Sequence, residues 1–348
     1  MSIPIDSFII LDIGTAWTKA FLVDPKETLK VKVSAKLPTS TEDLRYSANL
    51  LINKLKQNSK NPKILITSTF SEANSLEKEL DASFVTKEQV NKELFEWFTL
   101  QSLENPIILD GGANNFLRNL RAADIGAYLS FPIGEKDLEN YIGNKTMRLS
   151  SIPEDKNHLE IEEAVLRASF NLYPDFHNPT KFNSVVITGG ILSWSTKPTR
   201  LALLLLDLMS GGKVVQVFQD KSAFLNSFGA LIYHKKSFKQ KSDILKNLGS
   251  IVSLGGGGKV ALDYGLSDIQ EVTISENEIA LIPALSSQSV KITLFSEPKR
   301  VFQVSGGEWG VILDGRVKPL PLQFGQVRTR QAVTSWQRAL EKVEVLDI

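Results

Sequence analysis

The chain of 348 residues contains no cysteine. This absence excludes disulfides, cysteine nucleophiles, iron–sulfur clusters and thiolate zinc sites. It fits a protein of the reducing cytoplasm, which is the location we expect. The chain also has no excess of charge of one sign, because 40 Lys and Arg face 39 Asp and Glu, a formal net charge of +1. Neither nucleic acid nor an anionic membrane surface is therefore an expected partner.

Long apolar runs are scarce as well. The most hydrophobic run is Leu201–Met209, LALLLLDLM, which is too short to cross a bilayer and is interrupted by Asp207. We expect it to be a buried helix and expect no membrane span. The start, MSIPIDSFII, lacks the basic residues and long apolar core of a signal peptide. A composition of 42% hydrophobic and 23% charged residues is typical of a globular protein, here long enough for two or three domains.

A polar turn separates the first two apolar runs, in SFIILDIGTAWTKAFLVD (Ser7–Asp24). Both flanks read as strands, whereas a Walker loop or a dinucleotide fingerprint leads into a helix. Gly14 allows close approach of an anion, Thr15 and Thr18 offer hydroxyl donors, and Asp12 can hold Mg²⁺ through water. The alternative is an ordinary β-turn whose N–H groups donate hydrogen bonds to the carboxylate of Asp12.

The same design returns in PIILDGGANNF, where a second apolar strand ends in Asp110 and is followed by Gly111 and Gly112. A third strand, SVVITGGILS, ends in Gly189 and Gly190, whose missing side chains leave room for a flat base or sugar. Two carboxylates facing each other across a cleft would suit phosphoryl transfer or hydrolysis on a Mg²⁺-phosphate. One would hold the metal and the other would orient the nucleophile.

The strand pattern suggests two similar cycles. Strands at Phe8–Leu11, Lys19–Val23 and Val31–Leu37 predict a three-stranded meander. After the second aspartate, Leu117–Gly134 offers another strand or two, so the two halves look like an ancient duplication. From Ile251 to Leu322 short strands alternate with turns, which predicts a small sandwich or barrel.

These patterns divide the chain into five parts. We predict a first lobe over 1–103, a second lobe over 104–234, a linker over 235–250, a β-rich domain over 251–324 and a C-terminal helix over 325–348. The basic stretch HKKSFKQKSD, which marks the linker, could equally be a solvated helix end.

Three motifs resemble those of a known superfamily. LDIGTAWTKA, LDGGANN and VVITGGILS are similar to the phosphate-one, phosphate-two and adenosine motifs of the actin, heat-shock chaperone and sugar-kinase ATPases. Within that superfamily, VVITGGILSWSTKPTRLALLLLDLMSGGKVVQVFQDKSAFLNSFGAL and GGEWGVILDGRVKPLPL resemble the glutamate mutase MutL-like family. The resemblance implies an α/β, two-lobed ribonuclease-H-like (actin-like ATPase) fold with an appended small β-rich C-terminal domain. It also implies ATP and Mg²⁺ in the cleft, and a chaperone or reactivating role for a protein partner, often a cobalamin-dependent mutase.

The resemblance also assigns site residues. The first phosphate loop would comprise Asp12, Gly14, Thr15, Thr18 and Lys19, the second would comprise Asp110, Gly111, Gly112 and Asn114, and the base would lie against Gly189 and Gly190. The two aspartates are the catalytic candidates, and Asp12 is the metal candidate. The second loop departs from the superfamily, which continues with glycine, threonines and an acidic residue, because this chain has Ala-Asn-Asn-Phe at 113–116.

That departure leaves hydrolysis open and supports an alternative from another class. The protein would then be a nucleotide-free pseudo-ATPase scaffold, or an interaction protein that assembles into filaments. Dehydratase activators share a similar opening motif, but their iron–sulfur cluster needs cysteines that this chain lacks. A small-molecule kinase is disfavoured, because no catalytic base beyond the two aspartates is evident.

Overall fold

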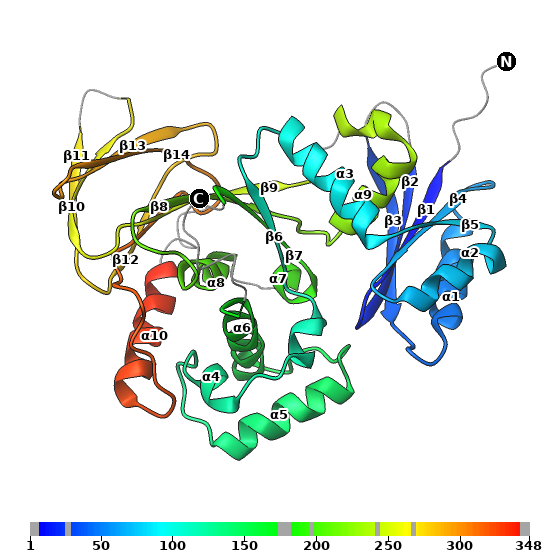
Figure 1. The fold of residues 1–348 in the computed structure, drawn as a ribbon, viewed down its shortest axis with the longest axis horizontal. Helices are drawn as coiled ribbons and strands as arrows, with labels where there is room; N and C mark the ends of the chain where they lie inside the picture. Colours follow the sequence, from blue (N-terminus) through cyan, green and yellow to red (C-terminus); the bar gives the residue numbers. More distant parts are fainter. Residues whose placement is uncertain are drawn as a thin grey trace.

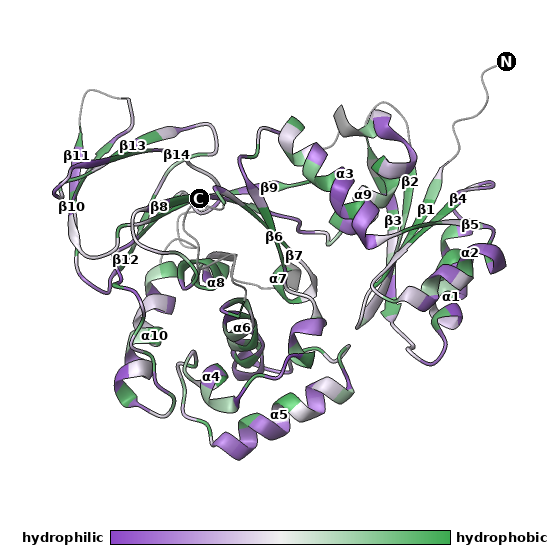
Figure 2. Ribbon diagram, in the orientation of Figure 1, coloured by the Kyte–Doolittle hydropathy of each residue, from purple (hydrophilic) through white to green (hydrophobic). Residues whose placement is uncertain are grey.

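A computed structural model describes residues 7–24, 29–172, 182–194, 198–240, 244–265 and 269–341. The chain forms a mixed α/β structure in which two large sheets each carry helices, and a smaller sheet covers part of the second (Figure 1). This confirms the predicted two-lobed α/β class. Figure 2 shows hydrophobic residues concentrated in the strands and in α8, whereas α5 is largely hydrophilic.

The first sheet has the strand order β3-β2-β1-β4-β5, and its first three strands form the predicted antiparallel meander. β4 and β5 run parallel to β1. All six residues of β1 are buried, as expected of a central strand covered on both faces. The strands are β1 (Phe8–Ile13), β2 (Trp17–Asp24), β3 (Lys30–Pro38), β4 (Lys63–Ser68) and β5 (Ala82–Val85).

Helices cover both faces of this sheet. One face packs on α1 (Leu44–Lys56), η1 (Ser71–Ser75) and α2 (Leu76–Glu79). The other packs on α3 (Lys87–Leu100) and on α9 (Leu225–His234), which comes from much later in the chain. α3 and α9 touch at Gly229, where a Cβ would lie 2.6 Å from Val90 Cγ1. Residues predicted for the second lobe therefore complete the core of the first.

The second sheet has the order β12-β15-β9-β8-β7-β6, of which β6, β7 and β8 are parallel neighbours. The helices α4, α6, α8 and α10 pack on one face of this sheet. The elements of this lobe are β6 (Pro106–Asp110), α4 (Ala122–Gly126), α5 (Glu135–Met147), α6 (Lys156–Phe170), β7 (Ser184–Thr188), α7 (Gly190–Trp194), η4 (Pro198–Leu201), α8 (Ala202–Leu206), β8 (Lys213–Gln219), β9 (Lys246–Ser253), β12 (Ile279–Ile282), β15 (Val311–Asp314) and α10 (Val327–Glu341). The 3₁₀ helix η5 (Lys236–Gln240) follows α9 and packs with it and with α3.

The strands expected within Leu117–Gly134 are wrong. After β6 the chain enters the 3₁₀ helix η2 (Ala113–Leu117), then α4 and α5, so the hairpin of the first half has no counterpart here. The reason is the buried Asn115, whose Nδ2 donates to the carbonyls of Asp110 at 2.9 Å and Gly112 at 2.8 Å. Its Oδ1 accepts from Ser169 Oγ on α6. These bonds close a tight turn in place of a hairpin.

The β-rich part shares its framework with the second lobe. β9, β12 and β15 belong to the six-stranded sheet, and β9 begins inside the range predicted as a linker. The remaining strands form a separate sheet of order β11-β10-β13-β14 that packs face to face on β9, β12 and β15. They are β10 (Gly258–Asp263), β11 (Gln270–Ile274), β13 (Ser289–Leu294) and β14 (Arg300–Ser305). The domain boundaries themselves stay a prediction.

A buried ionic cluster fastens this part to the helices. The fully buried Arg316 donates to Asp314 at 2.7 Å and to Asp207 at 3.0 Å, and Asp207 also pairs with Arg167 at 2.6 Å. The guanidinium carbon of Arg316 lies 4.6 Å from the ring centroid of Trp336 on α10.

Among the described helices, none combines the length and the apolar character that crossing a bilayer requires.

Candidate functional site

One cleft gathers the ends of β1, β6 and β7. It is lined by both aspartates and by most of the glycines singled out in the sequence, and its volume is about 190 Å³. The predicted site residues that line it are Asp12, Gly14, Thr15, Lys19, Asp110, Gly112, Asn114, Gly189 and Gly190. Two predicted residues, Thr18 and Gly111, do not line it.

The first loop is a short hairpin turn between β1 and β2. Gly14 N–H donates to Trp17 O at 3.1 Å, and Gly14 O accepts from Thr39 Oγ1 at 2.8 Å. Thr18 is fully buried behind the turn, 3.0 Å from Thr39 Oγ1, so its hydroxyl supports the loop rather than facing the cleft. The N–H and hydroxyl of Thr15 have no hydrogen-bond partner in the described part of the chain, which leaves them free to donate to an anion.

The ammonium group of Lys19 lies near three aspartates, Asp12, Asp110 and Asp220. Its Nζ lies 3.3 Å from Asp12 Oδ2 and 3.5 Å from the carbonyl of Ala223, which precedes α9. Burial lowers the pKa of Lys19, but the charges of Asp12, Asp110 and Asp220 outweigh burial, so that the pKa is raised. The ammonium therefore bridges the first sheet and the start of α9 as a permanent cation.

The second loop packs tightly around Asp110. Its Oδ1 accepts from Gly112 N–H at 2.9 Å, and Gly111 N–H donates to Thr188 O at 2.8 Å. Burial raises the pKa of Asp110, although the nearby Lys87 and Lys19 lower it in part. Gly189 has φ of +99°, and a Cβ there would lie 2.5 Å from Asp110 Oδ1. The β6 and β7 turns can therefore meet only if this position is glycine.

Asp220 was missed by the sequence reasoning. It follows β8 and is fully buried, where it accepts from Phe224 N–H at 2.9 Å, Leu225 N–H at 2.7 Å and Thr188 Oγ1 at 2.8 Å. It thus orders the start of α9, and burial raises its pKa in spite of these bonds. The signal was present, because KVVQVFQD is a third strand that ends in aspartate.

The wall of the cleft carries further lysines. Lys36 lies over the Trp17 ring at 4.9 Å, and its pKa is lowered by burial and by the charge of Lys19. Lys145 is buried in a 2.5 Å ion pair with Glu162, while Lys221 is exposed at the rim. A polyanion in the cleft would therefore meet the ammonium groups of Lys19, Lys36 and Lys221, which all line it.

The donor set fits a phosphate and one Mg²⁺ held largely through water. Mg²⁺ commonly takes one or two protein carboxylates and keeps several waters. Asp12 and Asp110 can supply these, with Thr15 as a phosphate donor. A cluster of three or more metal-ligating side chains does not occur in the described ranges, so an all-protein metal cage is not indicated there.

Comparison with known proteins gives only distant likenesses. No family model matches the chain, and no curated protein matches it. Among solved structures, component A of (R)-2-hydroxyglutaryl-CoA dehydratase from Acidaminococcus fermentans is 14% identical, with a TM-score of 0.40 over 67% of this chain and 99% of that one.

Two further structures have bound nucleotide analogues. A ROK family glucokinase from Streptomyces griseus, in complex with glucose and AMPPNP, is 10% identical, with a TM-score of 0.42 over 64% of this chain and 97% of that one. The activator of 2-hydroxyisocaproyl-CoA dehydratase from Clostridium difficile, with bound ADPNP, is 13% identical, with a TM-score of 0.36 over 68% and 99%. Likenesses this low transfer no residue role to this chain.

Proposed function

We propose that this chain is an actin-like ATP-binding protein that uses its interlobe cleft to hold Mg-ATP. The observation that carries the proposal is the convergence of three glycine-bearing strand ends, at Gly14, Gly112 and Gly189, on one cleft with two aspartates. These strand ends are far apart in the sequence. A role confined to local turns gives no reason for them to meet.

The residues have distinct parts in this proposal. Thr15 and the ammonium groups of Lys19 and Lys36 bind phosphate oxygens, since each faces the cleft as a donor. Asp12 and Asp110 hold Mg²⁺ through water, and the metal neutralises phosphate charge when bound. Asp110 also orients a water molecule for hydrolysis, because burial raises its pKa and strengthens it as a base. Gly189 and Gly190 accommodate the base.

The finer role we propose is reactivation of a partner enzyme, such as a cobalamin-dependent mutase, by a member of the MutL-like family. Its support is the sequence resemblance around Gly189 and at the C-terminal end. Nucleotide would bias the cleft between open and closed states, and the partner would bind one state better than the other. Copurification of a mutase that depends on added ATP is the result we expect.

Titration calorimetry and thermal melting with Mg-ATP test the binding step. At a ligand concentration 100 times Kd, binding adds about 2.7 kcal/mol of stability. A chain of 348 residues unfolds with an entropy of about 0.7 kcal/mol/K, so we expect Tm to rise by about 4 °C. Asp12→Asn should remove most of the shift. A wild-type protein that gives no heat and no shift at millimolar Mg-ATP contradicts the proposal.

A second candidate is a nucleotide-free scaffold. Two observations favour it: the cleft volume of about 190 Å³ is below the ~300–1,000 Å³ of typical ligand sites, and Lys19 is already paired with Asp12. On this reading the ion pair stabilises a permanently closed cleft. Absence of nucleotide binding, together with a stable assembly in light scattering, would favour the scaffold.

A further inference from the structure

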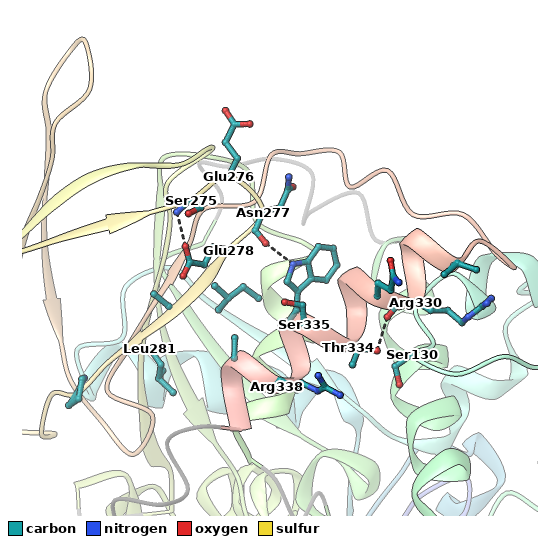
Figure 3. Close-up of a pocket in the computed structure, with 17 residues that line it drawn as sticks. Ser130, Ser275, Glu276, Asn277, Glu278, Leu281, Arg330, Thr334, Ser335 and Arg338 are labelled. Atoms are coloured by element: carbon teal, nitrogen blue, oxygen red, sulfur yellow. Dashed lines mark hydrogen bonds between the residues drawn. The ribbon is translucent and has the colours of Figure 1, made fainter.

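A groove separate from the nucleotide cleft lies between α4, the end of α6, the turn after α8 and the segment that follows Arg316. Among the residues that the structure describes, it shares no lining residue with the cleft, nor with the pocket beside β12 and α10 in Figure 3. Its volume of about 1,070 Å³ is close to the upper end of the ~300–1,000 Å³ typical of small-molecule sites. In size it therefore suits a small ligand.

Apolar side chains form most of the wall of this groove. Leu208 and Met209, which follow α8, are buried, and Leu320 and Phe324 are half-buried. The Phe324 ring packs directly on α4, because Gly126 has no side chain there and a Cβ would lie 2.2 Å from Phe324 Cδ2. This contact holds the two walls together, so the groove is preformed. A ligand with an apolar body gains free energy by covering these side chains.

A row of five ion-paired groups ends at the groove. Its members alternate in charge: Arg167 pairs with Asp207 at 2.6 Å, Asp207 with Arg316 at 3.0 Å, Arg316 with Asp314 at 2.7 Å, and Asp314 with Lys318 at 3.5 Å. Three cations therefore face two carboxylates. Asp207 lines the groove, but each of its oxygens already accepts from an arginine. Lys318 also lines the groove, and it is the end of the row that opens on it.

The ammonium of Lys318 is only partly compensated by the protein. Burial and the charge of Arg316 lower the pKa of Lys318 to about 8. The ammonium donates to the carbonyl of Leu206 and has a third N–H beyond its contacts with Leu206 and Asp314. The other charged residues that line the groove, Arg121 and Asp124, neutralise each other through hydrogen bonds of 2.8 and 2.6 Å. An anionic group in the groove would therefore be drawn to Lys318.

Ser210 supplies a second donor. Its Oγ is buried and forms no hydrogen bond within the described part of the chain, although the residue lines the groove. It follows Leu206, whose carbonyl holds Lys318, by four residues, so both donors belong to the end of α8. A buried hydroxyl without a partner costs free energy, and an acceptor on a ligand would recover it.

We propose that this groove binds a small amphipathic carboxylate, whose apolar body covers Leu208, Met209 and Phe324 and whose carboxylate accepts hydrogen bonds from Lys318 and Ser210. The apolar walls provide most of the affinity, and the two donors fix the orientation of the ligand and select for an acid. This goes beyond nucleotide binding, because it gives the chain a site for an organic acid outside the cleft.

Displacement of a fluorescent fatty acid, dansyl-undecanoate, from the full chain tests the proposal. We expect decanoate, used below its micelle concentration, to displace the probe. Decanol has the same chain length without the carboxylate, and we expect it to need at least tenfold higher concentrations, since it lacks the charge-assisted bond to Lys318. A probe that does not bind, decanoate that does not displace it, or decanol that displaces it equally well each overturns the proposal.

Two substitutions test the donors. Lys318→Met keeps the apolar stem and removes the ammonium, so it should weaken decanoate at least tenfold and leave decanol within twofold. Ser210→Ala removes a hydroxyl that has no partner, so the folded chain should keep its stability while decanoate weakens about threefold. Unchanged decanoate affinity in either variant overturns the proposal, and Ser210→Ala keeps the test valid if Lys318→Met fails to fold.

Two further substitutions locate the ligand. Ala123→Trp places a large side chain in the groove from α4 and should abolish binding of both ligands; normal decanoate binding by this variant would show that the ligand lies elsewhere. Lys136→Met, on an exposed α5 lysine that does not line the groove, should leave decanoate within twofold, and a tenfold loss would reveal unspecific charge attraction and contradict the proposal. Calorimetry of Lys318→Met with Mg-ATP reads the nucleotide cleft separately, so the two proposals can fail independently.

Discussion

Replacement of Lys19 by methionine tests the electrostatic centre of the cleft. Lys19 lies 3.3 Å from Asp12, and its raised pKa reflects the additional charges of Asp110 and Asp220. Removing one partner of a buried ion pair typically costs about 3–5 kcal/mol, because the remaining charge is left uncompensated. With an unfolding entropy of about 0.7 kcal/mol/K for 348 residues, Tm should fall by about 4–7 °C at pH 8.

The pH dependence of this loss identifies its cause. In the wild type, the raised pKa of Lys19 means that its contribution is complete below pH 10.5 and is lost only as pH rises through the folded-state value. In Lys19→Met, Asp110 and Asp220 lose the nearby charge of Lys19, which lowers their pKa values against the effect of burial, so they take up protons on acidification more readily in the folded chain. The Tm difference between mutant and wild type should therefore shrink at pH 5.

Differential scanning calorimetry of both proteins at pH 8 and pH 5 measures this. Lys221→Met is the matched control, because Lys221 lines the same cleft but is exposed, and it should shift Tm by less than about 1 °C. A Lys19→Met shift under 1 °C at pH 8, or an equal shift at both pH values, would refute the ion-pair reasoning.

Three further variants probe other contacts. Thr18→Val should lower stability by about 1 kcal/mol through loss of the Thr39 bond while leaving the Mg-ATP melting shift unchanged; loss of that shift would return Thr18 to the phosphate donors. Arg316→Ala should lower the free energy of unfolding by about 3–5 kcal/mol in urea, since Asp207 loses a buried partner, and a change under 1 kcal/mol would show that water replaces it. Gly189→Ala should cost about 1–3 kcal/mol by chemical denaturation, because its φ of +99° and its contact with the second loop exclude a Cβ; wild-type stability would mean that the turn readily rearranges.

The sequence was informative wherever a local pattern fixed the backbone. The alternating and apolar runs predicted the meander of β1, β2 and β3. Of the 11 site residues predicted from the motifs, all except Thr18 and Gly111 line the cleft. Periodicity could not reveal that Thr18 points inward, since that depends on the register of β2 against Thr39. The strand-Asp pattern of KVVQVFQD did mark Asp220, but its hydrogen bonds to Thr188 and to the start of α9 depend on tertiary contacts that the pattern does not show.

The limit of prediction from sequence is clearer in the second half of the chain. The sequence pattern predicts strands within Leu117–Gly134, but the structure has the short helix α4 and irregular turns there. The preceding turn is closed by hydrogen bonds from the buried Asn115 to the carbonyls of Asp110 and Gly112, and such side-chain bonds leave no trace in hydrophobic periodicity. The pairing of β9 with β8 was also not readable, because strand partners distant in sequence leave no local trace.

The placement of α9 has a consequence for how the protein is made. One face of the first sheet has its full apolar cover only when α9, which ends at His234, is available, although the predicted first lobe ends at residue 103. At ~5–20 residues per second, a ribosome needs on the order of ten seconds to add those 131 residues (234 − 103). During that interval Phe21 and its apolar neighbours are only partly shielded from water. The nascent chain therefore exposes a hydrophobic surface to which a holdase chaperone can bind.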